Sequence, residues 1–260
     1  MKRDERLSAL VELIAANGEV RVADAAQALG ASPATIRRDL GHLSTQQVLL
    51  RTRGGAAPNA VSYELPLRYK DVSRMAQKQR IATAAAGLVT TGGTVALNGG
   101  TTTTEVARAL ASSHRDEHTA QPAVTVVTNA VNIASELTLR SAMVVIVTGG
   151  VALDRSYELV GPLAANSMRD LHFDIAFIGV SGIDWRRGAT ATDDQEADIN
   201  RLMVDRADRV VVVADSTKLG RRAFATICRI DAVDMLITDD EAAPETVDRF
   251  GDVGVDVLRV

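Results

Sequence analysis

Seven short apolar runs between residue 94 and the C-terminus constrain the fold more than any other feature. They are 94–97, 124–127, 144–147, 175–178, 210–213, 235–238 and 255–258. The runs are mostly continuous rather than alternating, which is typical of strands that are covered on both faces. Helical stretches lie between them. This part of the chain therefore predicts a mostly parallel α/β sheet.

Small and polar residues follow several of these runs. Ligands of parallel sheets bind outside the carboxyl ends of the strands. Glycine lets backbone amides approach an anion, threonine adds a hydroxyl donor, and a helix N-terminus favours negative charge. We therefore expect a site for a small phosphorylated ligand, with Lys218 as the countercharge. The predicted residues are Asn98, Gly99, Gly100, Thr101, Thr102, Thr103, Thr128, Asn129, Gly149, Gly150, Gly179, Ser181, Gly182 and Lys218.

Each loop taken alone has a structural explanation, because a glycine pair can simply make a tight turn and a threonine can simply cap a helix. The loop 98–104 differs from the others, since four threonines at one helix start exceed what capping needs. No Gly-Lys-Ser/Thr follows its glycines, so the loop is not a Walker P-loop. ATP hydrolysis is not indicated.

The N-terminal segment predicts three short amphipathic helices. The first helix has one apolar face, formed by Leu7, Leu10, Val11 and Ile14, and it is expected to end near Asn17-Gly18. The same spacing recurs over 22–29, and Gly30 closes that helix. The last two helices are separated by a short turn that contains glycine, so together they predict a helix-turn-helix.

The third helix carries basic residues on its front. Ser32 is a good N-cap and Pro33 suits the first turn. Ile36, Leu40 and Leu43 form an apolar stripe. Arg37 and Arg38 lie outside this stripe and face solvent, as in a helix that lies in the DNA major groove. Residues 48–55 then predict a basic β-wing. The candidate DNA-binding residues are Ser32, Thr35, Arg37, Arg38, Arg51 and Arg53.

The charge distribution agrees with a small DNA-binding head on an acidic body. The whole chain of 260 residues has a net charge of −4, but the first 58 residues carry +2 and the remainder −6. Aromatic residues make up only 3% of the chain, which disfavours stacking of single-stranded bases. A single cysteine, Cys228, favours the reducing cytoplasm, and no apolar span indicates secretion or membrane insertion.

Other polar residues are expected to have structural roles. Asp193, Asp194 and Glu196 favour a helix N-terminus, and residues 239–241 predict a solvated turn. Trp185 either covers the mouth of the expected ligand pocket or packs against neighbouring side chains. The histidines are scattered, and His114 and His118 lie in a polar loop, so we expect no metal, no cofactor and no catalytic residue.

With these residues assembled, the chain resembles DeoR-type bacterial transcriptional regulators of sugar metabolism over nearly its whole length. The resemblance rests on residues 35–40, 51–56, 99–103, 126–129, 149–150 and 215–218. It implies a winged helix-turn-helix followed by an α/β sensor domain similar to ribose-5-phosphate isomerase. Such a regulator commonly represses an operon until a phosphorylated sugar or related metabolite binds.

Two positions depart from the family pattern. The family often has an aspartate where this chain has Asn98, and Gly-Ala-Asp-Gly where this chain has residues 179–182, Gly-Val-Ser-Gly. Both changes remove carboxylates that could accept sugar hydroxyls or act as a base. We therefore expect an effector that differs from the commoner ones.

The predicted organisation is a winged helix-turn-helix DNA-binding domain (1–57), a linker (58–72) and a sugar-phosphate sensor and oligomerisation domain (73–260). The expected partners are double-stranded operator DNA, a phosphorylated sugar and further copies of the chain in a dimer or tetramer, since paired half-sites extend a short readout. Two alternatives remain: a sugar-phosphate isomerase-like enzyme on the same fold, and an architectural or activating DNA binder. The missing carboxylates argue against the enzyme.

Overall fold

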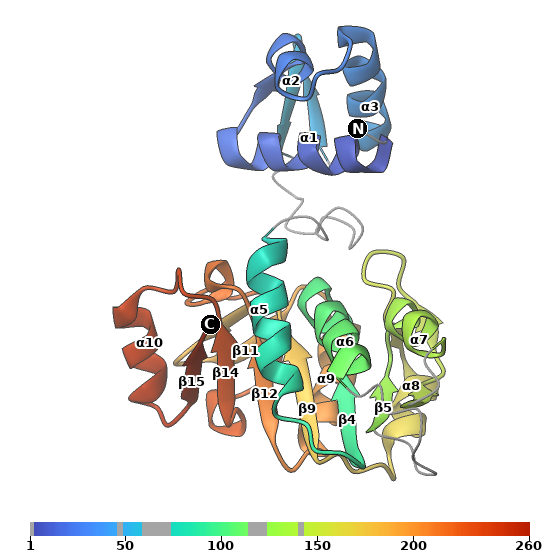
Figure 1. The fold of residues 1–260 in the computed structure, drawn as a ribbon, viewed down its shortest axis with the longest axis vertical. Helices are drawn as coiled ribbons and strands as arrows, with labels where there is room; N and C mark the ends of the chain where they lie inside the picture. The colour runs from blue at the N-terminus through green and yellow to red at the C-terminus, as the bar shows by residue number, and fades with distance from the viewer. Residues whose placement is uncertain (1–2, 46–48, 59–73, 114–123, 140–142) are drawn as a thin grey trace. The chain divides into compact units, whose positions relative to one another are not determined.

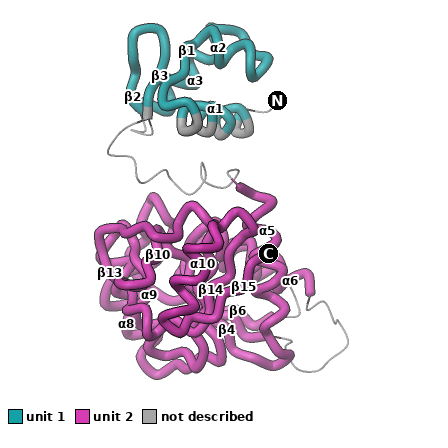
Figure 2. Tube along the Cα trace, turned by 90° about the vertical axis from the view of Figure 1, so that its left-hand side faces the viewer, with its two compact units in different colours: residues 1–73 teal, residues 74–260 magenta. Residues whose placement is uncertain are grey.

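The computed structural model describes residues 3–45, 49–58, 74–113, 124–139 and 143–260. The chain divides into two compact units, Met1–Ser73 (unit 1) and Arg74–Val260 (unit 2), coloured separately in Figure 2. Nearly all of the predicted linker 58–72 lies outside the described residues, so the domain boundaries proposed from the sequence stay a prediction.

Unit 1 has the three helices and the wing that the sequence predicts. Its elements are α1 (Arg3–Asn17), β1 (Val20–Arg21), α2 (Val22–Ala28), α3 (Pro33–Thr45), β2 (Leu49–Thr52) and β3 (Gly55–Pro58). The strands form an antiparallel sheet in the order β1-β3-β2. Gly18 and Gly30 follow α1 and α2 with φ of 71° and 58°, a left-handed conformation in which glycine is the least strained residue.

Unit 2 is built on a seven-stranded parallel sheet, and all seven predicted strands are confirmed. Its order is β15-β14-β12-β9-β4-β5-β6. The strands are β4 (Gly93–Leu97), β5 (Val124–Thr128), β6 (Met143–Val147), β9 (Ile175–Gly179), β12 (Val210–Val213), β14 (Met235–Thr238) and β15 (Asp256–Arg259). From β4 the chain first builds outward to β6 and then returns to β9 on the other side of β4, so the order reverses between β4 and β9.

Helices cover both faces of this sheet (Figure 1). They are α5 (Met75–Ala86), α6 (Thr101–Ser113), α7 (Val131–Leu137), α8 (Pro162–Met168), α9 (Asp194–Asp205) and α10 (Pro244–Gly251). Val95 and Leu97 pack on one face in a buried cluster with α5, α6 and α7, whereas Ala96 packs on the other face in a cluster with α8, α9 and α10. Burial on both faces explains why the strands read as continuous apolar runs.

Two smaller strand groups were not predicted from the sequence. β10 (Gly182–Asp184), β11 (Gly188–Ala191) and β13 (Ala225–Cys228) form an antiparallel sheet, and β7 (Val151–Ala152) pairs with β8 (Leu159–Val160) in a hairpin. These strands have two to four residues and are rich in glycine and alanine, so they lack the apolar run that marks a strand. The hairpin carries a buried glutamate to the carboxyl edge of the main sheet, as described below.

Candidate functional site

The predicted recognition helix α3 begins at an N-cap formed by Ser32. The Ser32 hydroxyl accepts a hydrogen bond from the Thr35 amide (3.2 Å), and the two hydroxyl oxygens are 2.9 Å apart. Ile36, Leu40 and Leu43 are fully buried in the core of unit 1. Arg37 and Arg38 are exposed on the same helix. The helix is therefore fixed by its apolar back, and its basic front stays accessible.

An ion pair that the sequence did not indicate ties α3 to α1. Arg6 Nε lies 2.6 Å from Asp39 Oδ2, and the Asp39 side chain is 3% exposed. A close, largely buried guanidinium–carboxylate pair holds the two helices in one relative position. Asp39 thus supports the presentation of α3.

The wing of unit 1 carries the two predicted arginines. β2 pairs with β3, and Arg51 and Arg53 are exposed along the strand and its turn. The Thr52 hydroxyl donates to Glu19 Oε1 (2.8 Å), which joins the wing to the segment before β1. A Cβ at Gly55 would lie 2.2 Å from the Val20 carbonyl oxygen, so only glycine allows this close strand approach.

In unit 2, Asn98 bridges β4 and β9 at the point where the strand order reverses. Its Nδ2 donates to the Gly179 carbonyl (2.9 Å) and its Oδ1 accepts from the Gly179 amide (2.7 Å). Asn98 is 1% exposed. Both groups of its side chain therefore hold the two loops together, at the place where open α/β sheets bind ligands.

The Gly99-Gly100 loop leads directly into α6. The hydroxyls of Thr103 and Thr104 donate to the Gly100 carbonyl (3.1 and 2.7 Å), so two of the four threonines act in the first helical turn itself. The amides of Thr101 to Thr103 belong to that turn, where no intrahelical acceptor exists. These amides are the groups of this loop that are suited to an anion.

The loops after β5 and β6 follow on the same edge of the sheet, since β5 pairs with β4 and β6 pairs with β5. The Thr128 hydroxyl accepts from the Ala130 amide (3.0 Å). Asn129 is fully buried, and its Oδ1 has no hydrogen-bond partner among the described residues. The Gly149 amide donates to Ser167 Oγ (3.3 Å), and a Cβ at Gly150 would lie 2.7 Å from the Val160 carbonyl oxygen.

Ser181 directly precedes the small antiparallel sheet, and Gly182 begins its strand β10. The Ser181 amide donates to the Thr190 carbonyl (2.9 Å), and a Cβ at Gly182 would lie 2.7 Å from the Arg221 carbonyl oxygen. Lys218 ends a short 3₁₀ turn, Ser216–Lys218, which the Asp215 carboxylate caps by accepting from the Thr217 amide (3.0 Å). The predicted effector residues thus lie at the carboxyl ends of the main-sheet strands, in the loops that follow them, in the first turn of α6 or, for Gly182, at the start of β10.

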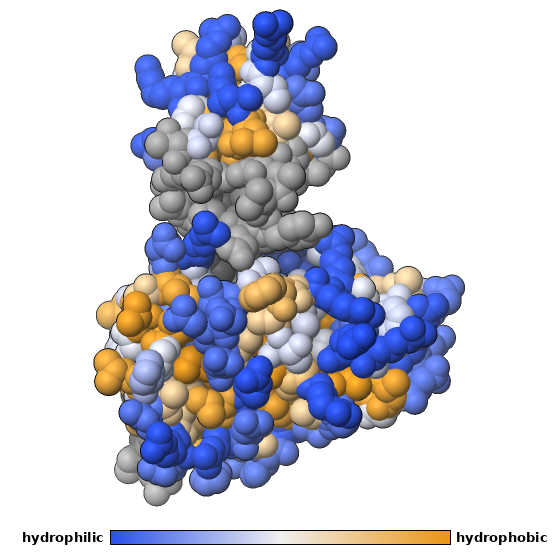
Figure 3. Space-filling view, turned by 180° about the vertical axis from the view of Figure 1, so that it is seen from behind, coloured by the Kyte–Doolittle hydropathy of each residue, from blue (hydrophilic) through white to orange (hydrophobic). Residues whose placement is uncertain are grey.

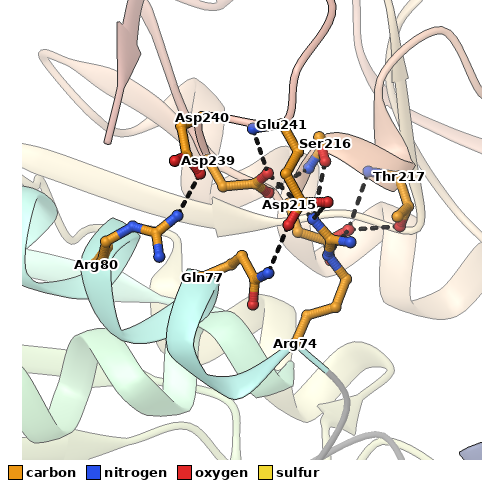
Figure 4. A network of polar contacts seen from close by, with 9 residues as sticks. All are labelled: Arg74, Gln77, Arg80, Asp215, Ser216, Thr217, Asp239, Asp240 and Glu241. Atoms are coloured by element: carbon orange, nitrogen blue, oxygen red, sulfur yellow. Dashed lines mark hydrogen bonds and ion pairs between the residues drawn. The ribbon is translucent and has the colours of Figure 1, made fainter.

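The sequence analysis did not identify Arg74, which contacts the loops after both β12 and β14 (Figure 4). Its Nη2 lies 3.0 Å from Ser216 Oγ, 3.1 Å from Asp239 Oδ1 and 3.0 Å from Glu241 Oε2. Its Nε lies 3.6 Å from Asp215 Oδ1. Arg74 directly precedes α5, so this cluster joins the start of unit 2 to the Asp215–Lys218 loop.

The prediction that residues 239–241 form a solvated turn is wrong for Asp239. Its side chain is fully buried, and it accepts from the Ser216 amide (2.7 Å) and the Glu241 amide (3.1 Å). Burial favours the neutral acid, but these amides and the Arg74 charge together hold the pKa of Asp239 below its usual value. A run of acids looks solvated in sequence because its cationic partner lies 165 residues away.

Glu158 is the second residue that sequence reasoning missed. It directly precedes β8 and is 2% exposed. Its carboxyl group accepts hydrogen bonds from Asn129 Nδ2 (3.2 Å) and from the Gly99 amide. Burial, together with the nearby Glu196 and Asp193, raises the pKa of Glu158 well above its usual value. A lone glutamate in a polar hairpin gives no signal of this role in the sequence.

The remaining expectations concern packing and metals. Asp193 caps α9 by accepting from the Gln195 and Glu196 amides, as predicted. Trp185 packs edge-on against Phe250 with ring centroids 6.0 Å apart. No group of three or more histidine, cysteine, aspartate or glutamate residues among the described residues could hold a metal ion. His114 and His118 lie outside that set.

Within the residues that the structure describes, no helix has the length and apolar character to cross a bilayer.

Comparison with known proteins agrees with this geometry. The protein-family model described as a DeoR-like helix-turn-helix domain matches residues 6–60, and the one described as a DeoR C-terminal sensor domain matches residues 73–240. The HTH-type transcriptional regulator GlpR of Haloferax volcanii is 34% identical over 98% of this chain and 96% of its own length. The glycerol-3-phosphate regulon repressor of Escherichia coli (strain K12) is 30% identical over 92% of both chains.

Solved structures give weaker likenesses. Ribose 5-phosphate isomerase A from Methanocaldococcus jannaschii aligns with a TM-score of 0.42 and 18% identity over 56% of this chain and 55% of its own. The sorbitol operon regulator SorC from Klebsiella pneumoniae aligns with a TM-score of 0.35 and 13% identity over 89% of this chain and 98% of its own.

The sequence relatives are named as regulators, which favours the regulator over the isomerase-like enzyme. The two matched families together span both units, from the recognition helix to the loops of the parallel sheet. The chain belongs to the DeoR family of DNA-binding transcriptional regulators.

Proposed function

We propose that this regulator represses a carbohydrate-metabolism operon and leaves its operator when a phosphorylated sugar or related metabolite binds to unit 2. The main support is the position of the Gly99-Gly100 loop. This loop directly precedes the N-terminus of α6, at the point where the strand order reverses. The relative that is named as a glycerol-3-phosphate regulon repressor supports a phosphorylated effector. The single, buried Cys228 suits a cytoplasmic protein.

On the DNA side, we assign contacts to the exposed basic residues of unit 1. Arg37 and Arg38 face the phosphates or base edges of the major groove, and Arg51 and Arg53 hold the flanking groove. Ser32 and Thr35 lie near the DNA backbone at the start of α3. Phosphate contacts set affinity and register, while base contacts give sequence choice.

On the effector side, the phosphate binds to the first-turn amides of α6, and Lys218 supplies the countercharge. An effector acts only through different affinities for the DNA-competent and DNA-incompetent arrangements. Lys218→Ala should therefore raise the effector concentration needed for release from DNA without changing operator affinity. Unchanged release would remove Lys218 from the site.

We also propose that the regulator acts as a homo-oligomer, since one recognition helix reads only one half-site. β6 forms one edge of the main sheet, and its Val144 and Ile146 are 41% and 39% exposed. Figure 3 shows several apolar patches on one face of unit 2. We infer that a second copy covers this edge. Ile146→Lys should then lower the mass in sedimentation, and an unchanged mass would contradict this interface.

The first experiment is a gel shift at a stated salt concentration, with DNA upstream of the neighbouring operon and a panel of sugar phosphates. Specific binding that one compound releases supports the repressor and identifies the effector. Specific binding that no compound releases contradicts the sensor assignment for that panel. Absence of specific binding contradicts the proposed operator recognition by the helix-turn-helix.

Arg37→Ala tests the recognition helix directly. It should weaken operator binding by about 5- to 150-fold if Arg37 reads a base, or lower the salt slope by about one if it contacts a phosphate. Arg229→Ala is the matched control, because it removes one exposed positive charge from unit 2. Equal effects of the two variants would contradict a specific role for Arg37.

A further inference from the structure

Exposed arginines gather where the small antiparallel sheet meets the loop after β12. Arg186 and Arg187 lie in the turn between β10 and β11. Arg221 lies against the start of β10, since a Cβ at Gly182 would be 2.7 Å from the Arg221 carbonyl oxygen. The three side chains are exposed, and none forms an ion pair with another residue that the structure describes. These arginines form a basic patch on a part of the chain whose net charge is −6.

Two aromatic residues accompany the basic patch. Phe224 follows Arg221 by three residues and is 83% exposed. Trp185 precedes Arg186 and is half-buried, and the guanidinium carbon of Arg249 lies 4.6 Å from the centroid of its ring. Arginine and large aromatic residues are enriched in protein–protein interfaces relative to the rest of a protein surface. The basic patch therefore has the composition of an interface.

The contact between Arg249 and Trp185 places α10 next to the basic patch, and α10 carries the opposite charge. Glu245, Asp248 and Asp252 recur at i, i+3 and i+7, and Asp252 continues the helical backbone after α10, so the three share one face. They are exposed and form no ion pair within the described part of the chain. The small sheet and α10 contribute to one buried cluster on the same face of the main sheet. The basic patch and this acidic stripe are therefore neighbours.

We infer that a second copy of the chain docks on this face through a twofold contact, in which the basic patch of each copy meets the acidic stripe of the other. A twofold interface uses the same surface on both copies, so that surface must be complementary to itself. Two neighbouring surfaces of opposite charge meet this condition, whereas a basic surface alone would repel its own copy. Phe224 supplies an apolar contact beside the charges.

The inferred contact is distinct from the one proposed at the β6 edge. The helix α10 packs beside β15, which forms the opposite edge of the main sheet (Figure 1). A substitution at one end of the sheet therefore leaves the other end intact, and the two contacts can be tested separately.

The test is sedimentation equilibrium of the full-length chain over a range of protein concentrations. A basic-patch variant carries Arg187→Glu and Arg221→Glu, and an acidic-stripe variant carries Glu245→Lys and Asp248→Lys. Each variant alone brings like charges together in the twofold contact, so the dissociation constant for this contact should rise by about tenfold or more. Exposed charges are screened by salt, so about 1 M salt should also weaken the wild-type contact relative to about 0.1 M.

Mixing the two variants gives the sharper result. In a pair made of one copy of each, both contacts again join opposite charges, so the mixture should associate within about threefold of the wild-type dissociation constant. Association of the mixture also shows that both variants are folded. Arg169→Glu and Asp170→Lys are the matched controls, because they reverse exposed charges of both signs at the end of α8 and should leave association unchanged.

Three outcomes would overturn the inference: wild-type association in either variant alone, a mixture that does not associate, or a wild type that stays monomeric. Loss of operator binding in a basic-patch variant of unchanged mass would also overturn it, and would assign the basic patch to DNA. If Ile146→Lys lowers the mass but the charge reversals do not, the contact at β6 stands and this one falls.

Discussion

Arg74 offers the most informative single substitution, because three carboxylates and a serine hydroxyl converge on its guanidinium. Arg74→Ala leaves Asp239 buried without its cation. Breaking a fully buried ion pair costs about 3–5 kcal/mol, and an exposed pair contributes about 0–1 kcal/mol. The Arg74 side chain is 23% exposed and Asp239 keeps two amide donors, so we expect a loss of about 2–3 kcal/mol.

Calorimetry would follow the unfolding transition of unit 2. For a domain of this size a loss of 1 kcal/mol lowers Tm by about 2–4 °C, so the expected shift is roughly 5–10 °C. Arg80→Ala is the matched control, because its ion pair with Asp240 is exposed on both sides and the substitution should cost about 0.5 kcal/mol or less. Equal shifts for the two variants would refute the argument that burial gives the Arg74 cluster its strength.

The pH dependence gives an independent check. The pKa of Asp239 is held below its usual value in the folded protein, so its stabilising contribution is present at neutral pH and is lost as the pH falls through the folded pKa. The difference in stability between wild type and Arg74→Ala should therefore be full at pH 7 and shrink below about pH 4. A difference that grows in acid would contradict the assignment to Asp239.

Three further substitutions or modifications test the packing of the two sites. Gly99→Ala places a Cβ 2.4 Å from Glu158 Cγ and should cost about 1–3 kcal/mol in thermal unfolding; Glu158→Ala should restore part of this loss, and an additive double mutant would contradict the clash. Asp39→Asn weakens the pair with Arg6, so hydrogen exchange should quicken in α1 and α3 while unit 2 is unchanged; unchanged exchange in unit 1 would show that the pair does not hold the helices. Burial raises the pKa of Cys228 to about 11, so about one thiol in a thousand is ionised at pH 8. The native protein should therefore react slowly with a thiol reagent. If the native protein reacted as fast as the urea-unfolded protein, the burial of Cys228 would be contradicted.

The amino-acid sequence by itself determined the elements that follow from local order. Ile36, Leu40 and Leu43 repeat at the helical period and Ser32 caps the same helix, so α3 could be located from a window of a dozen residues. Likewise, each strand of the main sheet could be located as an uninterrupted apolar run, because both faces of that sheet are buried. The glycine and threonine loops then followed from the rule that ligands meet the carboxyl ends of parallel strands.

Only the tertiary structure decided which distant groups meet at that edge. Arg74 reaches Asp239 across 165 positions, and Glu158 reaches the Gly99 loop only because the β7–β8 hairpin folds back over it. Polar side chains carry no periodicity that names their partners, whereas apolar side chains report their burial through spacing. The placement of charge therefore depends on how the strands are ordered in the sheet.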